Sequence, residues 1–82
     1  MVINKNLRIK IVNMISRAGE GHIPSAFSIV DILNFLYSEV LNINVKNLNS
    51  NYRDYFILSK GHGCAALYVV LNKFNILSDN DL

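Results

Sequence analysis

The apolar residues of this chain form three stretches with helical periodicity. Over residues 4–18 they recur at spacings of three and four, with most charged residues on the other face, which predicts an amphipathic helix. Residues 29–41 carry a broader apolar stripe and predict a second helix, which Ser28 and Asp31 would open because they have the spacing of an N-terminal cap pair. A third helix is predicted over 63–74, from a run rich in alanine, valine and leucine.

The first two helices are separated by a segment rich in helix-breaking residues. Gly19 is a natural helix stop, and glycine and proline interrupt the residues up to 25. Pro24 disfavours a helical conformation at Ile23, which we expect to be extended. The pattern therefore predicts that His22 lies on a loop between two helices.

The second half of the chain contains a loop, a short apolar run and a further turn. Residues 42–52 are rich in asparagine and predict a connecting loop. Residues 56–58 are fully apolar and bounded by charge and glycine, as in a buried parallel strand. Asn75 is the predicted stop of the third helix, and Ser78 with Asp81 has the spacing of a new helix cap. We expect a fourth helix to begin there, and the chain to be truncated inside its first turn.

These elements predict the fold class α/β. Because one strand cannot form a sheet, we expect the opening helices and first strand of a larger parallel-sheet domain, mostly helical within this chain. Eighty-two residues allow at most one small domain, and the apolar fraction of 51% excludes disorder. This is much apolar surface for a small interior, which suggests that some of it meets a partner or missing sequence.

Charge and targeting signals narrow the function further. The net charge of +2 comes from scattered basic residues, which gives no support for nucleic-acid binding. No apolar run reaches the ~18 residues of a membrane span, and the N-terminus lacks the features of a signal peptide, so we expect a cytoplasmic protein. The single cysteine, Cys64, excludes an internal disulfide and a cysteine-based zinc site, and we interpret it as a small buried helix residue rather than a nucleophile.

Two histidines are the main candidates for chemistry. His62 lies between two glycines where the apolar run meets the third helix, and a helix N-terminus there would favour an anion or polar ligand. Its imidazole can act as acid or base near neutral pH, or it can simply cap the helix. His22 and the hydroxyl of Ser25 can face a cleft from their loop, or His22 can be an ordinary surface residue.

The remaining polar candidates give weaker signals. Lys60 can meet a phosphate or lie in solvent, and Asp54 is best explained as pinning the turn before the apolar run. Glu20 is the only other acid near these loops. The sequence has no His-x-x-x-His, no Gly-x-Gly-x-x-Gly and no Walker loop, so it gives no support for metal or nucleotide binding by those motifs.

Two blocks of the sequence resemble the N-terminal segment of transketolases. They are Gly21-His22-Ile23-Pro24-Ser25, followed by Ser28 to Leu33, and Arg53-Asp54-Tyr55-Phe56-Ile57-Leu58-Ser59-Lys60-Gly61-His62-Gly63. The likeness covers nearly the whole chain and is most similar to the N-terminal subunit of split, two-chain transketolases. It implies that residues 1–82 are part of an N-terminal domain that is incomplete at its C-terminus.

The resemblance implies a role for three residues. His22 matches a loop histidine that contacts substrate and assists proton transfer. His62 matches a histidine beside the diphosphate of thiamine diphosphate, and Ser25 matches a small polar position that lines the cofactor cleft in some members. Lys60 and Gly61 match the supporting loop. The implied cofactor is thiamine diphosphate with Mg²⁺, and the implied substrate is a sugar or sugar phosphate.

Two departures from the family pattern change what this chain can do alone. Many members have Pro-Gly after the first histidine, where this chain has Ile23-Pro24. The Gly-Asp-Gly…Asn motif that holds the metal is absent, and the glutamate that activates the cofactor belongs to a partner domain. The resemblance therefore implies that the rest of the thiamine-diphosphate domain and a pyrimidine-binding partner subunit complete the site.

Three hypotheses follow. The first is the N-terminal part of a transketolase-like subunit that contributes to two-carbon ketol transfer. The second is a non-catalytic remnant or structural module that needs a partner to fold. The third is a related thiamine-dependent enzyme such as deoxyxylulose-phosphate synthase. The sequence of residues 54–62 argues against it, because this run resembles transketolases.

Overall fold

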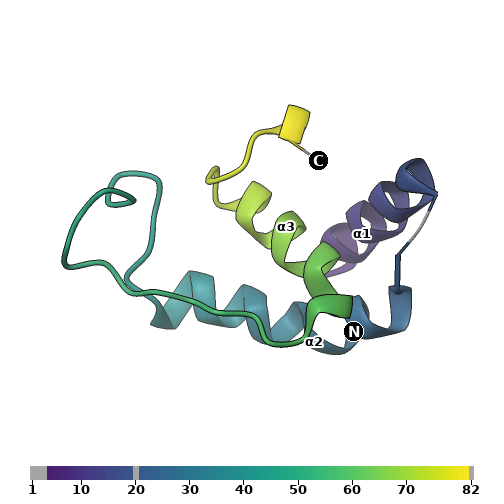
Figure 1. Ribbon diagram of the computed structural model, residues 1–82, viewed down its shortest axis with the longest axis horizontal. Coiled ribbons are helices and arrows are strands. Elements are labelled where there is room, and N and C mark those ends of the chain that lie inside the picture. The colour runs from purple at the N-terminus through teal and green to yellow at the C-terminus, as the bar shows by residue number, and fades with distance from the viewer. Residues whose placement is uncertain (1–3, 20, 82) are drawn as a thin grey trace.

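The computed structural model describes residues 4–19 and 21–81, and three α-helices dominate them (Figure 1). They are α1 (Lys5–Ala18), α2 (Ile23–Phe35) and α3 (Cys64–Lys73). Three short turns accompany them: the π-helical turn η1 (Leu36–Val40) and the 3₁₀ turns η2 (Gly61–Gly63) and η3 (Asp79–Asp81).

Helix α1 agrees with the sequence-based prediction. It begins after Asn4 and ends at Gly19, whose backbone N–H donates to the carbonyl of Ile15 at 3.0 Å. Its apolar stripe places Leu7 and Ile11 in the core, as the spacing of three and four requires.

Helix α2 begins at Ile23, earlier than the predicted start at residue 29. Pro24 lies in the first turn, where a missing N–H costs nothing because that group has no intrahelical partner. The expectation that Ile23 is extended was therefore wrong, and His22 is the extended residue instead, at the N-cap. Helix α2 ends at Phe35, and the π-helical turn η1 continues it to Val40, one residue before the predicted helix end at Leu41.

The predicted cap formed by Ser28 and Asp31 was wrong as well, because both residues lie inside α2. The Ser28 hydroxyl donates to the backbone carbonyl of Ser25 at 2.9 Å. Asp31 instead accepts two hydrogen bonds from Arg8 of α1, at 2.9 and 3.0 Å, and one from Asn4 at 2.7 Å. The carboxylate thus joins two helices rather than starting one.

The core lies where the three helices meet. Each pair of helices is in contact, and the most deeply buried side chains come from all three. The fully buried residues of largest volume are Ile11, Val30, Val69 and Val70. Helix α3, predicted over 63–74, supplies the last two and confirms the third predicted helix.

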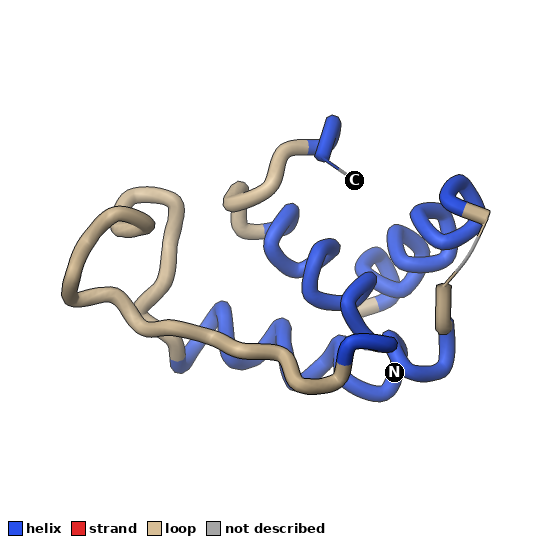
Figure 2. Tube along the Cα trace, in the orientation of Figure 1, coloured by secondary structure: helices blue, strands red, loops and turns tan. Residues whose placement is uncertain are grey.

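The predicted strand at 56–58 is absent, and the part of the chain that the structure describes contains no strand (Figure 2). The segment is extended but unpaired, with Tyr55 69% and Ile57 87% exposed. A parallel strand exists only through the ladder to its neighbours, and the described residues offer no neighbouring strand. The helical part of the predicted α/β domain is therefore present, without the sheet.

Residues 54–63 run back along α2, which Figure 1 shows as the green trace beside that helix. The backbones of Asp54 and Asn42 are joined by an N–H···O bond of 2.9 Å just beyond the C-terminal end of the helical stretch. Further along, Phe56 packs edge-on against Tyr37, with ring centroids 5.9 Å apart. The segment reaches the N-terminal half of α2 at Lys60, so the chain returns to the start of this helix.

The chain after α3 turns at Asn75, which has a positive φ of 64° and ends the helix as predicted. The predicted fourth helix appears in the described residues only as the 3₁₀ turn η3.

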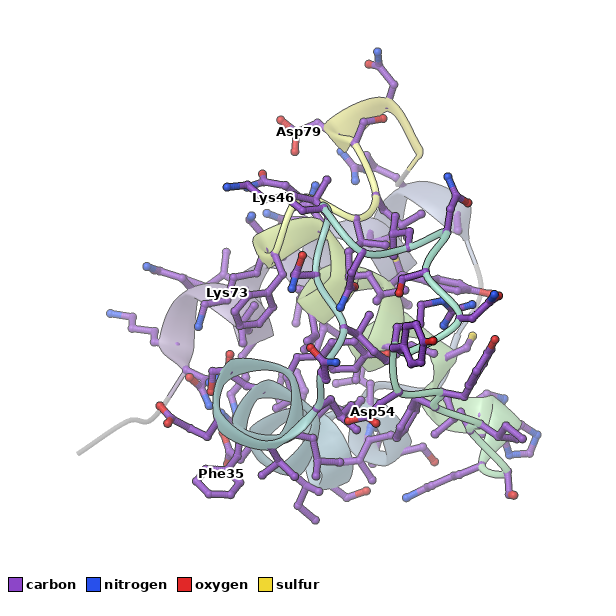
Figure 3. All side chains as sticks on the ribbon, turned by 90° about the vertical axis from the view of Figure 1, so that its left-hand side faces the viewer. Phe35, Lys46, Asp54, Lys73 and Asp79 are labelled. Atoms are coloured by element: carbon purple, nitrogen blue, oxygen red, sulfur yellow. The ribbon has the colours of Figure 1, made fainter. Side chains whose placement is uncertain are left out.

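On the side of the molecule opposite η3, the side chain of Phe35 points away from the body of the protein and is 58% exposed (Figure 3). No helix in the described ranges is long and apolar enough to cross a membrane.

Candidate functional site

His22 is placed by the connection between α1 and α2. It is the N-cap of α2, and its backbone carbonyl accepts a hydrogen bond from the N–H of Ala26 at 3.1 Å. The preceding Gly21 has φ 148°, and a Cβ there would lie 2.7 Å from Cγ1 of Ile15. Glycine is therefore needed at 21 both for its backbone conformation and for the close packing against α1.

His62 is placed by the turn η2, which leads into α3. The N–H of Gly63 donates to the carbonyl of Lys60 at 3.0 Å and closes the turn. A Cβ on Gly63 would lie 2.6 Å from Cδ1 of Ile29 and 3.4 Å from the carbonyl oxygen of Ser25. The absence of a side chain at 63 thus lets the turn approach the N-terminal half of α2 closely.

The two candidate histidines lie against each other. Their imidazole rings stack with centroids 4.3 Å apart and an angle of 23° between the planes. Both residues are solvent-exposed. The structure therefore brings together two residues that the sequence presented separately.

A pocket of about 390 Å³, the polar pocket, borders His62 and is lined mainly by polar residues. Its lining combines one cation, two hydroxyls and an imidazole: Ser25, Ser59, Lys60, Gly61 and His62. The Lys60 ammonium donates to the hydroxyl of Ser28 at 2.6 Å, so it is held at the edge of this pocket. Cations and hydroxyl donors in this combination suit an oxyanion such as a phosphate.

A second pocket, of about 300 Å³, borders both histidines and is mainly apolar. Both imidazoles contribute to it, together with Met14, Ile15, Ala18, Gly21, Gly61, Cys64, Ala65 and Tyr68. His62 thus borders both a polar and an apolar pocket, which suits a ligand with a charged end and a flat apolar end.

Two helix N-termini meet at the site. Helix α2 begins directly after His22, and η2 with α3 begins directly after Lys60. Neither α2 nor α3 carries an acidic residue in its first turn. The positive ends of both helix dipoles therefore favour a negative ligand, although the N–H groups of Gly63 and Cys64 are already bonded within η2.

The groups whose pKa values the structure shifts lie outside the candidate site. The guanidinium of Arg8 and, second, the amide of Asn4 donate to Asp31 and lower the pKa of its carboxyl. The same ion pair raises the pKa of Arg8. Burial raises the pKa of the Tyr37 phenol. These groups belong to the packing between elements and not to the candidate site.

Of the two acids that the sequence singled out, Asp54 does not line the site. Asp54 accepts a hydrogen bond of 2.6 Å from the backbone N–H of Asn42, which confirms that it pins the turn before the extended segment. Glu20 lies outside the described residues. Within residues 4–19 and 21–81, no three His, Cys, Asp or Glu side chains are grouped so that they could hold a metal ion.

Sequence reasoning missed several lining residues. Ser59 was part of the block that resembles transketolases, but no role was assigned to it. Met14 and Ile15 were assigned to the helix stripe, and only the return of His62 to α1 turns part of that stripe into a pocket wall. Cys64, predicted to be buried, is partly exposed at the same pocket.

A comparison with protein families identifies this class of domain. The family described as "Transketolase, thiamine diphosphate binding domain" matches residues 1–78. The chain therefore belongs to the thiamine-diphosphate-binding domain family of transketolases.

Individual relatives agree with this family. The chain is 40% identical to a transketolase of Aquifex aeolicus across 90% of the chain's length. It is 30% identical to human transketolase across 93% of the chain's length. It is 44% identical, over 78% of its length, to one of the subunits of the apulose-4-phosphate transketolase of Actinobacillus succinogenes. The chain spans 11%, 12% and 23% of these relatives, respectively. No solved structure matches the chain significantly.

Proposed function

We propose that this chain supplies one face of a thiamine-diphosphate site for two-carbon ketol transfer between sugars. The observation that carries the proposal is the stacking of His22 on His62, which borders both a pocket with a cation and an apolar pocket. Membership of the thiamine-diphosphate-binding family gives this arrangement a ligand with matching ends, a diphosphate and an aromatic ring system.

The residues present fit the diphosphate end of the cofactor. His62 and Ser25 would hold it, because both line the polar pocket next to the cation of Lys60 and the positive ends of two helix dipoles. Thiamine diphosphate, when bound, supplies the carbon nucleophile that ketol transfer requires. The protein's own contribution on this face is binding, orientation and proton management.

His22 is the residue that we assign to proton transfer. An imidazole can gain or lose a proton near neutral pH, and in such a role it contributes about 10²–10⁴-fold to a rate. The backbone of His22 is fixed by Gly21 and by the start of α2, so its ring has a defined position beside His62. Stacking against a second imidazole orients the ring further.

The magnesium ion of the proposed cofactor does not fit the described residues, which include no cluster of ligands for it. We assign its ligands to sequence outside this chain. The apulose-4-phosphate transketolase relatives are by their names single subunits of an assembly, and we extend this to our chain as a partner subunit that completes the site. A sugar or sugar phosphate is the proposed substrate, and the cytoplasm is the proposed location.

A non-catalytic role is the second candidate. The extended segment with Ile57 and Tyr55 exposed favours it, as does the lack of a metal-ligand cluster among the described residues, since both features need another chain or domain for completion. In that case the chain would be a structural module whose histidines have no chemical task.

Calorimetry separates the two candidates. We expect the 82-residue chain to bind thiamine diphosphate weakly, with an affinity that Mg²⁺ does not increase and that His62→Ala reduces. Tight, magnesium-dependent binding by these residues alone would contradict the assignment of the metal ligands to other sequence. In the assembled enzyme, His22→Ala should lower kcat by about 10²–10⁴-fold with little change in cofactor affinity. Full activity of that variant would favour the structural module.

A further inference from the structure

Lys60 takes part in a short chain of hydrogen bonds between the 59–63 loop and helix α2. Its ammonium Nζ lies 2.6 Å from Oγ of Ser28. An ammonium group can only donate, so the Ser28 oxygen accepts this bond. The hydroxyl proton of Ser28 is directed to the carbonyl oxygen of Ser25, at 2.9 Å. The path therefore has one direction, from Lys60 through Ser28 to the first turn of α2.

The position of this hydrogen-bond path lets it influence where the ring of His62 lies. Lys60 immediately precedes η2, and Gly63 at the end of the turn packs against Ile29, the neighbour of Ser28. The turn that carries His62 is thus attached to α2 by a polar contact before it and an apolar contact after it. Both attachments are needed to define where the ring lies, because the imidazole itself is exposed.

The partner that accepts the hydrogen bond of Lys60 is a neutral group. It is a hydroxyl whose own proton is already committed, and not a carboxylate. The contact therefore holds the side chain in place and leaves its positive charge intact at the polar pocket. A bond of this kind fixes geometry without neutralising the pocket.

We propose that Lys60 is a positioning residue, which through Ser28 fixes the 61–63 turn on α2 and so keeps the ring of His62 stacked on that of His22. Its catalytic purpose rests on the proposed function. The stacking of the two rings is measured without cofactor. A result against the role of the Lys60–Ser28 hydrogen bond can therefore be told apart from a failure of cofactor binding.

The test is solution NMR of the isotope-labelled chain. The readout is the nuclear Overhauser effect between ring protons of His22 and His62, with the methyl resonances of Val30 and Val70 as a check that the core is intact. Lys60→Met removes the donor. Ser28→Val and Ser28→Thr are matched in shape, and only threonine keeps the accepting hydroxyl.

We expect the ring-to-ring effect to fall several-fold in Lys60→Met and in Ser28→Val, and to persist in Ser28→Thr. Combining Lys60→Met with Ser28→Val should cause no further loss, because each change breaks the same path. Lys46→Met, which removes a lysine from the distant 42–52 loop, should leave the effect unchanged. An undiminished effect in Lys60→Met with an intact core, or equal behaviour of the threonine and valine variants, would overturn the proposal.

Discussion

The imidazole of His62 lies on the imidazole of His22, with ring centroids 4.3 Å apart, although the two residues belong to different connections of the chain. The contact results from the path of residues 54–63, which follow α2 back to its first turn. One histidine caps α2 and the other leads into α3. Two helix starts and two imidazoles therefore share one small surface.

The first prediction concerns the fit of Gly63 on Ile29. Gly63→Ala should lower the free energy of unfolding by about 1–2 kcal/mol, as expected for mild overpacking, because its Cβ would lie 2.6 Å from Cδ1 of Ile29. Ile29→Val deletes that methyl carbon and should reduce the cost of the alanine. Urea denaturation of the two single variants and the double variant measures this coupling.

Gly61→Ala is the matched control for this prediction. A Cβ at 61 meets nothing within 4 Å, so the substitution should change stability by no more than about 0.5 kcal/mol. Equal costs at positions 61 and 63 would show that the turn is not packed against α2 as described.

The second prediction concerns Tyr37, which holds the returning segment. Its ring packs against Phe56 and also against Phe74 of the α3 C-terminus, at centroid distances of 5.9 and 6.4 Å. Tyr37→Ala should cost about 3 kcal/mol in thermal or urea unfolding, because a large buried ring is lost. Tyr37→Phe keeps the ring and should cost less than about 1 kcal/mol. Similar losses in both variants would place the energy in the hydroxyl instead.

Tyr37 also predicts an alkaline pH dependence. Burial raises the pKa of its phenol above the ordinary value of 10.0, so the folded state disfavours the phenolate. The resulting stability is fully present below the unfolded-state pKa and is lost as the pH rises through the folded-state pKa. Tyr37→Phe should therefore flatten the decline of stability above about pH 10.

The third prediction concerns residues 56–58, which were predicted to form a strand and are unpaired in the structure. Because Ile57 is 87% exposed and unpaired, Ile57→Lys should change the unfolding free energy by no more than about 0.5 kcal/mol. Leu58→Lys is the control, since Leu58 is partly buried and should cost clearly more. Thermal unfolding of both variants gives the comparison. A large loss at 57 would indicate that the segment is paired or buried in solution.

The fourth prediction concerns the pH dependence of the contact between α1 and α2. Hydrogen bonds from Arg8 and Asn4 lower the pKa of Asp31 below the ordinary value of 3.8. The stabilisation is present above the unfolded-state pKa and is lost as the pH falls through the folded-state pKa. Unfolding curves between pH 6 and pH 2 should show a decline that begins below about pH 5 and is shallower in Asp31→Asn. Identical pH profiles for the two proteins would contradict this assignment.

The helices were predictable because their signals are local. The spacing of Leu7 and Ile11 defines the buried face of α1, and Asn75 marks the end of α3. The start of α2 was mispredicted because Pro24 is compatible with a first helical turn as well as with a loop, and the sequence alone does not separate these cases. Ser28 and Asp31 have the spacing of a helix cap, but both lie inside α2. Their side chains bond to Ser25 and to Arg8 instead.

The site was predictable only in its parts. Glycine-flanked histidines pointed to His22 and His62, yet their stacking depends on how the segment between α2 and α3 returns, which no local pattern encodes. The apolar run at 56–58 has the composition of a buried strand, but strand formation needs partners from elsewhere. The bond from Lys60 to Ser28 is likewise a tertiary contact without a sequence signature.

The most direct test of the thiamine-diphosphate face is chemical-shift mapping of the labelled chain with millimolar thiamine diphosphate. We expect the largest shifts at Ser25, Lys60 and His62, reproduced by inorganic pyrophosphate and strongly reduced in the His62→Ala variant. The Lys46→Met variant should respond like the unmodified chain. Shifts that are absent, or that gather at residues away from the histidine pair, would contradict the proposal.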